Sequence, residues 1–121
     1  MESILTSIKK MLGIAEEYKH FDPDLIMHIN SVLMTLTQIG VGPSEGFMIE
    51  DELSMWRDFL PDGSNLEAIK SYIYLKVKLL FDPPTNSTVI AAYERMITEH
   101  EWRLNHAVEV PSSTAEEDDV E

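Results

Sequence analysis

Apolar residues recur along this chain at intervals of three and four positions, which is the spacing of one face of an α-helix. The first set predicts a short amphipathic helix ending at Gly13, because glycine accepts the left-handed conformation common after a helix C-terminus. A second set predicts a longer helix that starts at Asp22-Pro23, with Asp22 as the capping acid, and stops at Gly40. The apolar positions of these helices are Ile4, Leu5, Ile8, Met11 and Leu12, and then Leu25, Ile26, Ile29, Leu33, Leu36 and Ile39.

The widest apolar pattern lies in the second half of the chain. Residues 72–79 alternate as in a strand, but the pattern extends over 66–80 and makes two adjoining helical stripes. We therefore expect a central helix that is packed on more than one side. Its predicted stop is Asp82, Pro83 and Pro84, because proline lacks a backbone donor and disfavours the helical conformation of the preceding residue. The stripes are Leu66, Ile69, Ile73, Val77 and Leu80, and Ala68, Tyr72, Leu75 and Leu79.

Between these helices, residues 40–46 contain three glycines and Pro43 and are expected to form a loop. A brief helix is predicted over 50–59, with Leu53, Trp56 and either Phe59 or Leu60 facing inward. A closing helix, capped from Thr85-Asn86-Ser87, then carries Val89, Ala92, Tyr93, Met96, Ile97 and Leu104.

The predicted fold class is all-α, a small bundle of about four principal helices with short accessory helices. We expect the helical domain to span residues 1–107. After Val110-Pro111 the chain is mainly serine, threonine and acid, with little to bury. Residues 108–121 are therefore predicted to be a disordered, acidic C-terminal tail.

Charge narrows the classes of function. The chain has 22 acidic and 9 basic residues, a formal net charge of −13, whereas tight binding to nucleic acid relies on lysine and arginine. It has no cysteine, which excludes disulfides and thiolate metal sites. No apolar run approaches the ~20 residues that span a membrane, and the first ten residues do not have the pattern of a signal peptide. We expect a soluble protein in the cytoplasm of the cell that makes it, with no membrane partner.

Candidate chemistry is weak. Gly42-Pro43-Ser44-Glu45-Gly46 matches the G-x-S-x-G pattern of a nucleophilic serine, but neither a preceding strand nor a parallel sheet is predicted, so a turn is the better interpretation. The four histidines lack metal-ligand spacing. The acidic residues of 22–24 and 50–52 lie where helices are predicted to begin. Carboxylates are favourable there because the N-terminal end of a helix carries a partial positive charge, so these acids need no catalytic role. We therefore expect no catalytic residue, cofactor or metal, and no enzyme.

One stretch carries a family resemblance. The order Lys70, Tyr72, Tyr74, Leu75, Lys76, Val77, Leu79, Leu80, Phe81, Asp82, Pro83, Pro84, then Tyr93, Glu101, Trp102, Arg103 and Leu104, is similar to the closing pattern of the head-tail connector (adaptor, or DNA-packaging) family of tailed bacteriophages. Gly40-Val41-Gly42, Gly46-Phe47, Trp56 and Phe59-Leu60 also resemble that family, so the likeness covers most of residues 1–107.

The resemblance implies a structural protein of the virion neck, assembled from the host cytoplasm. Copies would form a ring, dodecameric by analogy, on the portal protein after DNA packaging, and a downstream neck (stopper) or tail-completion protein would dock beneath. DNA would pass through without sequence-specific binding. The alternative from another class is a small acidic regulatory or adaptor protein that binds a single host or phage protein.

Two segments are candidates for protein interfaces. The terminal helix and tail commonly engage the portal in connectors, which implies Trp102, Arg103, Leu104, Val108 and Val110 here. Trp102 falls off the main apolar stripe of its helix, so it packs on a secondary face of the chain or contacts a partner. The second candidate is Phe47, Met48 and Ile49, for which a loop folded over the core is the alternative.

Overall fold

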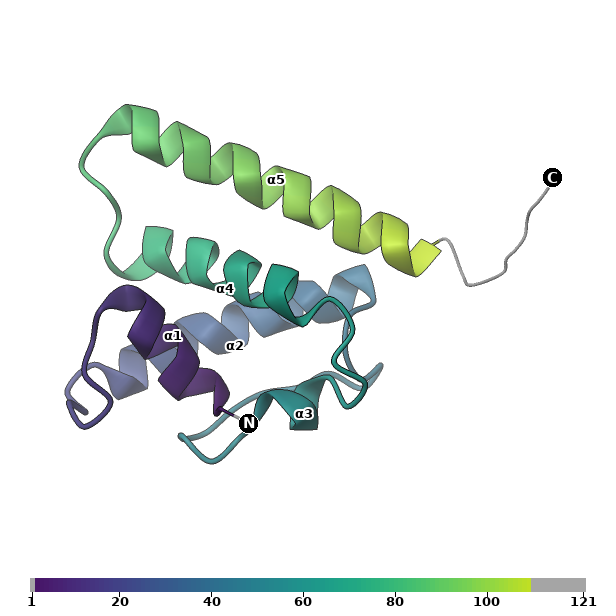
Figure 1. Cartoon of the computed structure of the whole chain (residues 1–121), viewed down its shortest axis with the longest axis horizontal. Coiled ribbons are helices and arrows are strands. Elements are labelled where there is room, and N and C mark those ends of the chain that lie inside the picture. The colour runs from purple at the N-terminus through teal and green to yellow at the C-terminus, as the bar shows by residue number, and fades with distance from the viewer. Residues whose placement is uncertain (1, 110–121) are drawn as a thin grey trace, which may run out of the picture.

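The structure is a computed structural model that describes residues 2–109, with side chains as far as His106. Four long helices and the single-turn α3 follow one another along the chain (Figure 1). They are α1 (Ile4–Leu12), α2 (Asp22–Ile39), α3 (Trp56–Phe59), α4 (Leu66–Phe81) and α5 (Ser87–Glu109). No strand occurs between residues 2 and 109 apart from an isolated antiparallel bridge of Ser3 with Met55, so the all-α prediction is confirmed.

The structure describes only part of the region for which a domain end at 107 and an acidic tail over 108–121 are predicted. Helix α5 continues to Glu109, two residues beyond the predicted end of the domain. The acidic tail from 110 onward, and with it Val110, lies outside the described residues, as does the side chain of Val108.

Local capping signals fix both ends of α1 and the C-terminal end of α2. Ser3 precedes α1, and its Oγ accepts a 3.0 Å hydrogen bond from the backbone N–H of Thr6. Gly13 and Gly40 follow α1 and α2 in left-handed conformations, with φ of 82° and 102°. A residue with a Cβ is strained there, so glycine ends both helices at little cost.

The start of α2 corrects the assignment of Asp22 as a capping acid. Phe21 is the residue at the N-cap, and no side chain caps the helix. The Asp22 carboxylate instead forms an ion pair with Lys9 on α1, with Oδ1 2.9 Å from Nζ. Lys9 is only 2% exposed, and its Nζ also donates to the backbone carbonyls of Glu16 at 2.9 Å and Tyr18 at 2.7 Å. This lysine therefore ties the connection between α1 and α2 to the bundle.

The segment before α3 also differs from expectation. The predicted helix over 50–59 is reduced to Trp56–Phe59, and Leu53 is exposed. The backbone before Trp56 is hydrogen-bonded to the N-terminal segment, since Ile4 N donates to Ser54 O at 3.0 Å. Trp56 is buried, as predicted, and its Nε1 donates to Ser7 Oγ at 2.8 Å. These long-range bonds hold the backbone at Ser54 and Met55 outside the helix, so α3 starts only at Trp56.

Helix α4 is the central element that the sequence predicts. It packs against α1, α2 and α5 and buries Ile69, Tyr72, Ile73, Leu75 and Val77. It ends at Phe81, with Asp82 outside the helix before Pro83 and Pro84, so the predicted stop is confirmed. Leu80 is a correction to the first stripe, since it is 53% exposed. It lies in the last turn, where it borders a shallow hollow between α2 and α5.

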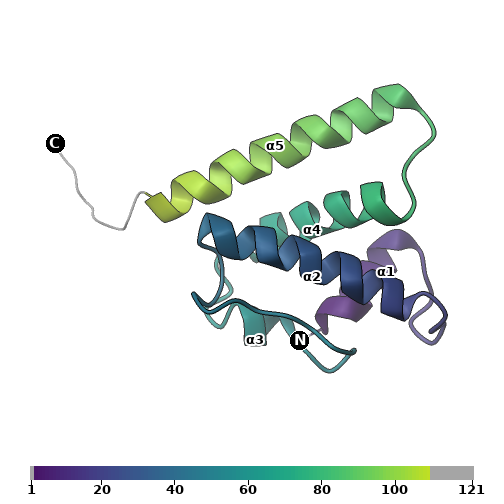
Figure 2. The same ribbon diagram turned by 180° about the vertical axis from the view of Figure 1, so that it is seen from behind.

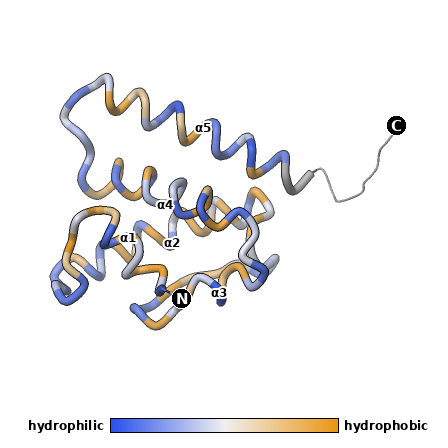
Figure 3. Tube along the Cα trace, in the orientation of Figure 1, coloured by the Kyte–Doolittle hydropathy of each residue, from blue (hydrophilic) through white to orange (hydrophobic). Residues whose placement is uncertain are grey.

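Helix α5 forms an outer layer. In both views it runs along one edge of the molecule, whereas α3 and the loop after α2 lie at the opposite edge (Figures 1 and 2). Apolar and polar positions are mixed along the part of α5 that is coloured in Figure 3. Asn86 begins it as predicted, because its Oδ1 accepts from Thr88 N at 2.8 Å. Of the predicted apolar face, Leu104 is buried, but Val89 and Met96 are partly exposed.

Candidate interaction surfaces

The outer face of α5 is open to solvent. Trp102 is 67% exposed and stacks on His106 one turn later, with ring centroids 5.1 Å apart. Arg103 lies beside it, 3.8 Å from Glu99, and both of these side chains are exposed. Arg95 is also exposed and makes no ion pair with the side chains described up to His106. Trp102 is thus not part of the core of the single chain, and its proposed contact with a partner stays a prediction.

Leu104 belongs to the opposite face of the same helix. Two residues along an α-helix correspond to about 200° of rotation, so the side chain of Leu104 points away from that of Trp102. It is 4% exposed and packs on the core, which removes it from the surface candidates. The resemblance implied that Leu104 and Trp102 belong to one interface, but of Trp102, Arg103 and Leu104 only the first two are exposed and available to a partner.

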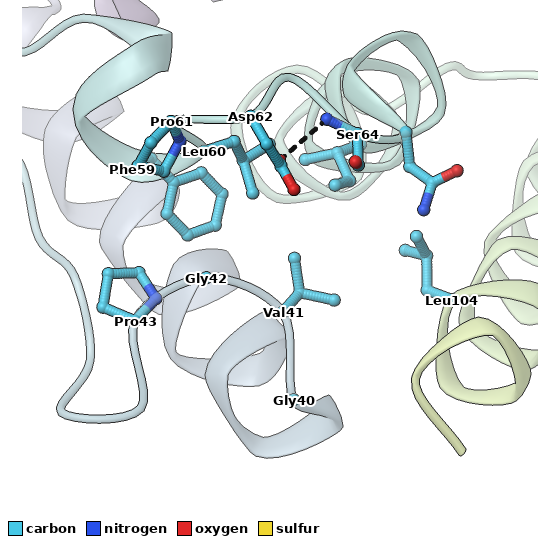
Figure 4. Close-up of a pocket in the computed structure, with 12 residues that line it drawn as sticks. Gly40, Val41, Gly42, Pro43, Phe59, Leu60, Pro61, Asp62, Ser64 and Leu104 are labelled. Atoms are coloured by element: carbon cyan, nitrogen blue, oxygen red, sulfur yellow. Dashed lines mark hydrogen bonds between the residues drawn. The ribbon is translucent and has the colours of Figure 1, made fainter. Parts of the chain in front are cut away.

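Leu104 also borders a hollow, shown in Figure 4. The hollow has a volume of about 630 Å³ and walls formed mainly by Val41, Phe59, Leu60, Ile69 and Leu104. The polar groups at its rim serve the local turn, since Asp62 Oδ1 accepts from Ser64 N at 3.0 Å. That backbone hydrogen bond lowers the pKa of the Asp62 carboxyl below its usual value.

The loop after α2 places its three candidates differently. Ile49 is buried and packs on the core, because Asn30 on α2 holds its backbone at both ends. Asn30 Oδ1 accepts from Ile49 N at 2.8 Å, and Asn30 Nδ2 donates to Ile49 O at 2.9 Å. Ile49 is therefore removed from the surface candidates. Phe47 is partly buried against Phe59, with centroids 5.2 Å apart, whereas Met48 is 69% exposed.

A groove runs between α2 and this loop. It has a volume of about 500 Å³ and is lined by Met34, Phe47 and Met48 as its apolar side chains, with Glu45 at its edge. Met34 and Met48 are both exposed. Methionine side chains are flexible and polarizable, so a groove of this kind adapts to an apolar or aromatic partner group.

A polar link joins the outer helix to the centre. The hydroxyl of the buried Tyr72 on α4 donates to Glu101 Oε2 on α5 at 2.7 Å, and Lys76 Nζ lies 3.7 Å from the same oxygen. Burial, followed by the hydrogen bond to the Glu101 carboxylate, raises the pKa of Tyr72 well above its usual value. The sequence reasoning missed this link, because a tyrosine in an apolar stripe gives no sign of its partner.

The remaining chemical candidates do not converge. Ser44 lies exposed in a turn closed by a 3.0 Å bond from Gly46 N to Pro43 O, as the turn interpretation predicts. Across residues 2–109, no three histidine, aspartate or glutamate side chains are grouped as metal ligands. No helix in that range is long and apolar enough to cross a membrane.

Comparison with known proteins agrees with the resemblance seen in the sequence. The model of the phage connector protein family matches residues 4–111. The chain belongs to the phage connector protein family. The match runs from the first residue of α1 past the end of α5, so all five helices of this phage connector are included. No curated protein and no solved structure matches this connector.

For this phage connector, the matched region contains both open surfaces. Trp102 and Arg103 lie on α5, and the methionine-lined groove lies between α2 and the following loop. Of the predicted interface residues with described side chains, Phe47, Met48, Trp102 and Arg103 remain accessible at the surface, whereas Ile49 and Leu104 are buried.

Proposed function

We propose that this connector joins the head and the tail of a tailed bacteriophage by occupying the virion neck, and that it catalyses no reaction. Copies assemble into a ring, a dodecamer in our proposal, on the portal protein after the genome has been packaged. A downstream neck (stopper) or tail-completion protein then docks on the ring. The observation that carries this proposal is the family match over residues 4–111.

The surface of the chain supports an assembly role. Trp102 and Arg103 are both exposed, and these two residue types are enriched among the residues that dominate the energy of protein interfaces. The family match also favours the connector over a small acidic regulatory protein that binds one target.

The charge of the chain suits a conduit for DNA. With a formal net charge of −13, the connector offers few groups to neutralise phosphates, so DNA is not gripped by it. Acidic side chains that face the channel repel the phosphate backbone at short range. DNA therefore lies in the ring without sequence-specific binding while the genome is retained, and it passes through the ring in the same way during ejection.

Deletion of the gene tests the proposal in infected cells. We expect capsids that assemble and package DNA but then lose it, or fail to join tails, because the neck is incomplete. Negative-stain electron microscopy counts tailed particles, and nuclease-protected DNA measures retention. Complementation with the wild-type gene is the control. Normal numbers of tailed, infectious particles from the deletion would end the connector proposal.

A further inference from the structure

We propose that neighbouring copies of this chain contact each other through two different surfaces, which rests on the ring of the proposed function. The first is the outer face of α5, defined by Arg95, Trp102 and Arg103, here called the α5 surface. The second is the groove defined by Met34, Phe47 and Met48 with Glu45 at its edge, here called the methionine groove. Trp102 of one copy enters the methionine groove of the next copy.

The first argument is geometric. Helix α5 runs along one edge of the molecule, and the loop that bounds the methionine groove lies at the opposite edge, with α2 between them (Figure 2). Trp102 itself borders a hollow shared with Thr35 and Ile39 of α2, whereas the methionine groove lies between α2 and the loop. Two different surfaces that contact each other between copies produce a head-to-tail contact, and such a contact closes into a ring when the rotation between copies allows it.

The second argument is charge complementarity. Residues 45–62 carry six acids against the single basic residue Arg57, and Glu45, Glu50 and Asp51 are exposed and make no ion pair within the described residues. The α5 surface carries Arg95 and Arg103, and Glu99 lies 3.8 Å from Arg103. Among the side chains that the structure describes, seven of the nine basic residues are held in ion pairs, and Arg95 is one of the two that are not.

The third argument is the fit of apolar groups. Trp102 leaves 67% of its surface in water, and Met34 and Met48 leave 62% and 69%. An aromatic ring buries ~150–250 Å² in an interface, and sulfur contacts to aromatic rings are favourable. The groove has a volume of about 500 Å³, and Phe47 forms its floor while packed on Phe59. The contact therefore covers three exposed apolar side chains at once.

Disulfide trapping tests the pairing, because the full chain has no cysteine of its own. Thr98→Cys places a thiol on α5 beside Trp102, and Ser44→Cys places one in the exposed turn beside the methionine groove. Met11→Cys is the matched control, since Met11 is exposed on α1 and belongs to neither surface. Each full-length variant is purified reduced, and pairs are mixed and oxidised.

We expect the Thr98→Cys and Ser44→Cys mixture to form mixed disulfides about tenfold faster than the Thr98→Cys and Met11→Cys mixture, because the contact raises the effective concentration of the thiols. Adding Trp102→Ala to the Thr98→Cys chain should return the rate to that of the control. High salt should slow the first mixture, since it screens the charges. Equal rates in the two mixtures, or a faster Thr98→Cys homodimer, would overturn the pairing.

A second measurement separates this pairing from the connector role itself. Trp102→Asp blocks the α5 surface and Met48→Asp blocks the groove, and both positions are exposed, so the chains should still fold. Either variant alone should stop ring growth, whereas a mixture should give a heterodimer by sedimentation velocity, because one intact contact remains. Rings from either single variant refute the pairing. They leave the connector role standing if gene deletion still abolishes tail joining.

Discussion

The hydroxyl of Tyr72 on α4 donates a 2.7 Å hydrogen bond to the carboxylate of Glu101 on α5. This bond holds the outer helix to the buried centre, because much of α5 is exposed and only Leu104 among its described side chains is fully buried. Tyr72→Phe removes the hydroxyl and keeps the ring. We expect a loss of about 1–2 kcal/mol in the free energy of unfolding, measured with urea, since bonds to charged groups are stronger than average but Glu101 is partly exposed.

The same bond predicts how stability depends on pH. The pKa of Tyr72 is raised in the folded chain, so the unfolded chain releases its proton first, near the ordinary value of 10.0. The contribution of Tyr72 to stability is complete below that value and is lost as the pH rises above it. The difference in melting temperature between wild type and Tyr72→Phe should therefore narrow above pH 10. A difference that stays constant into the alkaline range would contradict the assignment.

Replacing the buried Lys9 should destabilise the fold far more than replacing an exposed lysine. Its Nζ contacts Asp22 and two backbone carbonyls while the side chain is 2% exposed. Lys9→Met keeps the aliphatic stem but leaves Asp22 and these carbonyls without their partner. We expect a loss of ~3–5 kcal/mol, as for other broken buried ion pairs, measured by chemical denaturation.

Lys10→Met is the matched control for this variant. Lys10 is the next residue on α1, and its ion pair with Glu2 is exposed to solvent. Exposed pairs contribute little, so the midpoint of unfolding should stay close to that of wild type. Similar losses for the two variants would show that burial does not distinguish these lysines.

The helices of this chain could be predicted because their ends depend on local signals. Gly13 and Gly40 stop α1 and α2 by their own backbone conformation, and Pro83 stops α4 by its missing donor. The late start of α3 could not be predicted in this way. It depends on the pairing of Ile4 with Ser54, and no local pattern specifies which distant backbone a segment will bond.

The surface residues also divide into those that local periodicity predicts and those that depend on distant contacts. The 3.6-residue period places Trp102 and Leu104 on different faces of one helix, and the exposed Trp102 agrees with its position off the apolar stripe. The burial of Ile49 was open in the sequence, because it depends on the side chain of Asn30 from another helix. The pairing of Lys9 with Asp22 was missed for that reason too: residues far apart in sequence give no periodic signal.

The centre of α4 offers a matched pair of substitutions. Val77 is fully buried, whereas Leu80 in the following turn is 53% exposed. Val77→Asp places an unpaired charge in the core, which costs several kcal/mol against a total stability of ~5–15 kcal/mol, so we expect an unfolded chain. Leu80→Asp should keep the helical circular dichroism signal and melt cooperatively. An unchanged melting temperature for Val77→Asp would refute the central position of α4.

Substitutions at two glycines in the loop after α2 test whether this loop packs closely against the core. Gly42 and Gly46 have φ of +84° and +96°, so alanine is strained at both, at a cost of roughly 1–2 kcal/mol. At Gly42, however, a Cβ would lie 2.3 Å from the ring of Phe59, whereas at Gly46 nothing lies within 4 Å.

We expect Gly42→Ala to be less stable than Gly46→Ala by a further ~1–3 kcal/mol, because the buried ring of Phe59 must move to make room for the methyl group. Urea denaturation of both variants measures the difference, and wild type gives the reference. The backbone strain is common to the two alanines, so it largely cancels in the comparison. Equal stability of the variants would mean that Gly42 does not approach Phe59, and that the loop is held over the core by Asn30 and Ile49 alone.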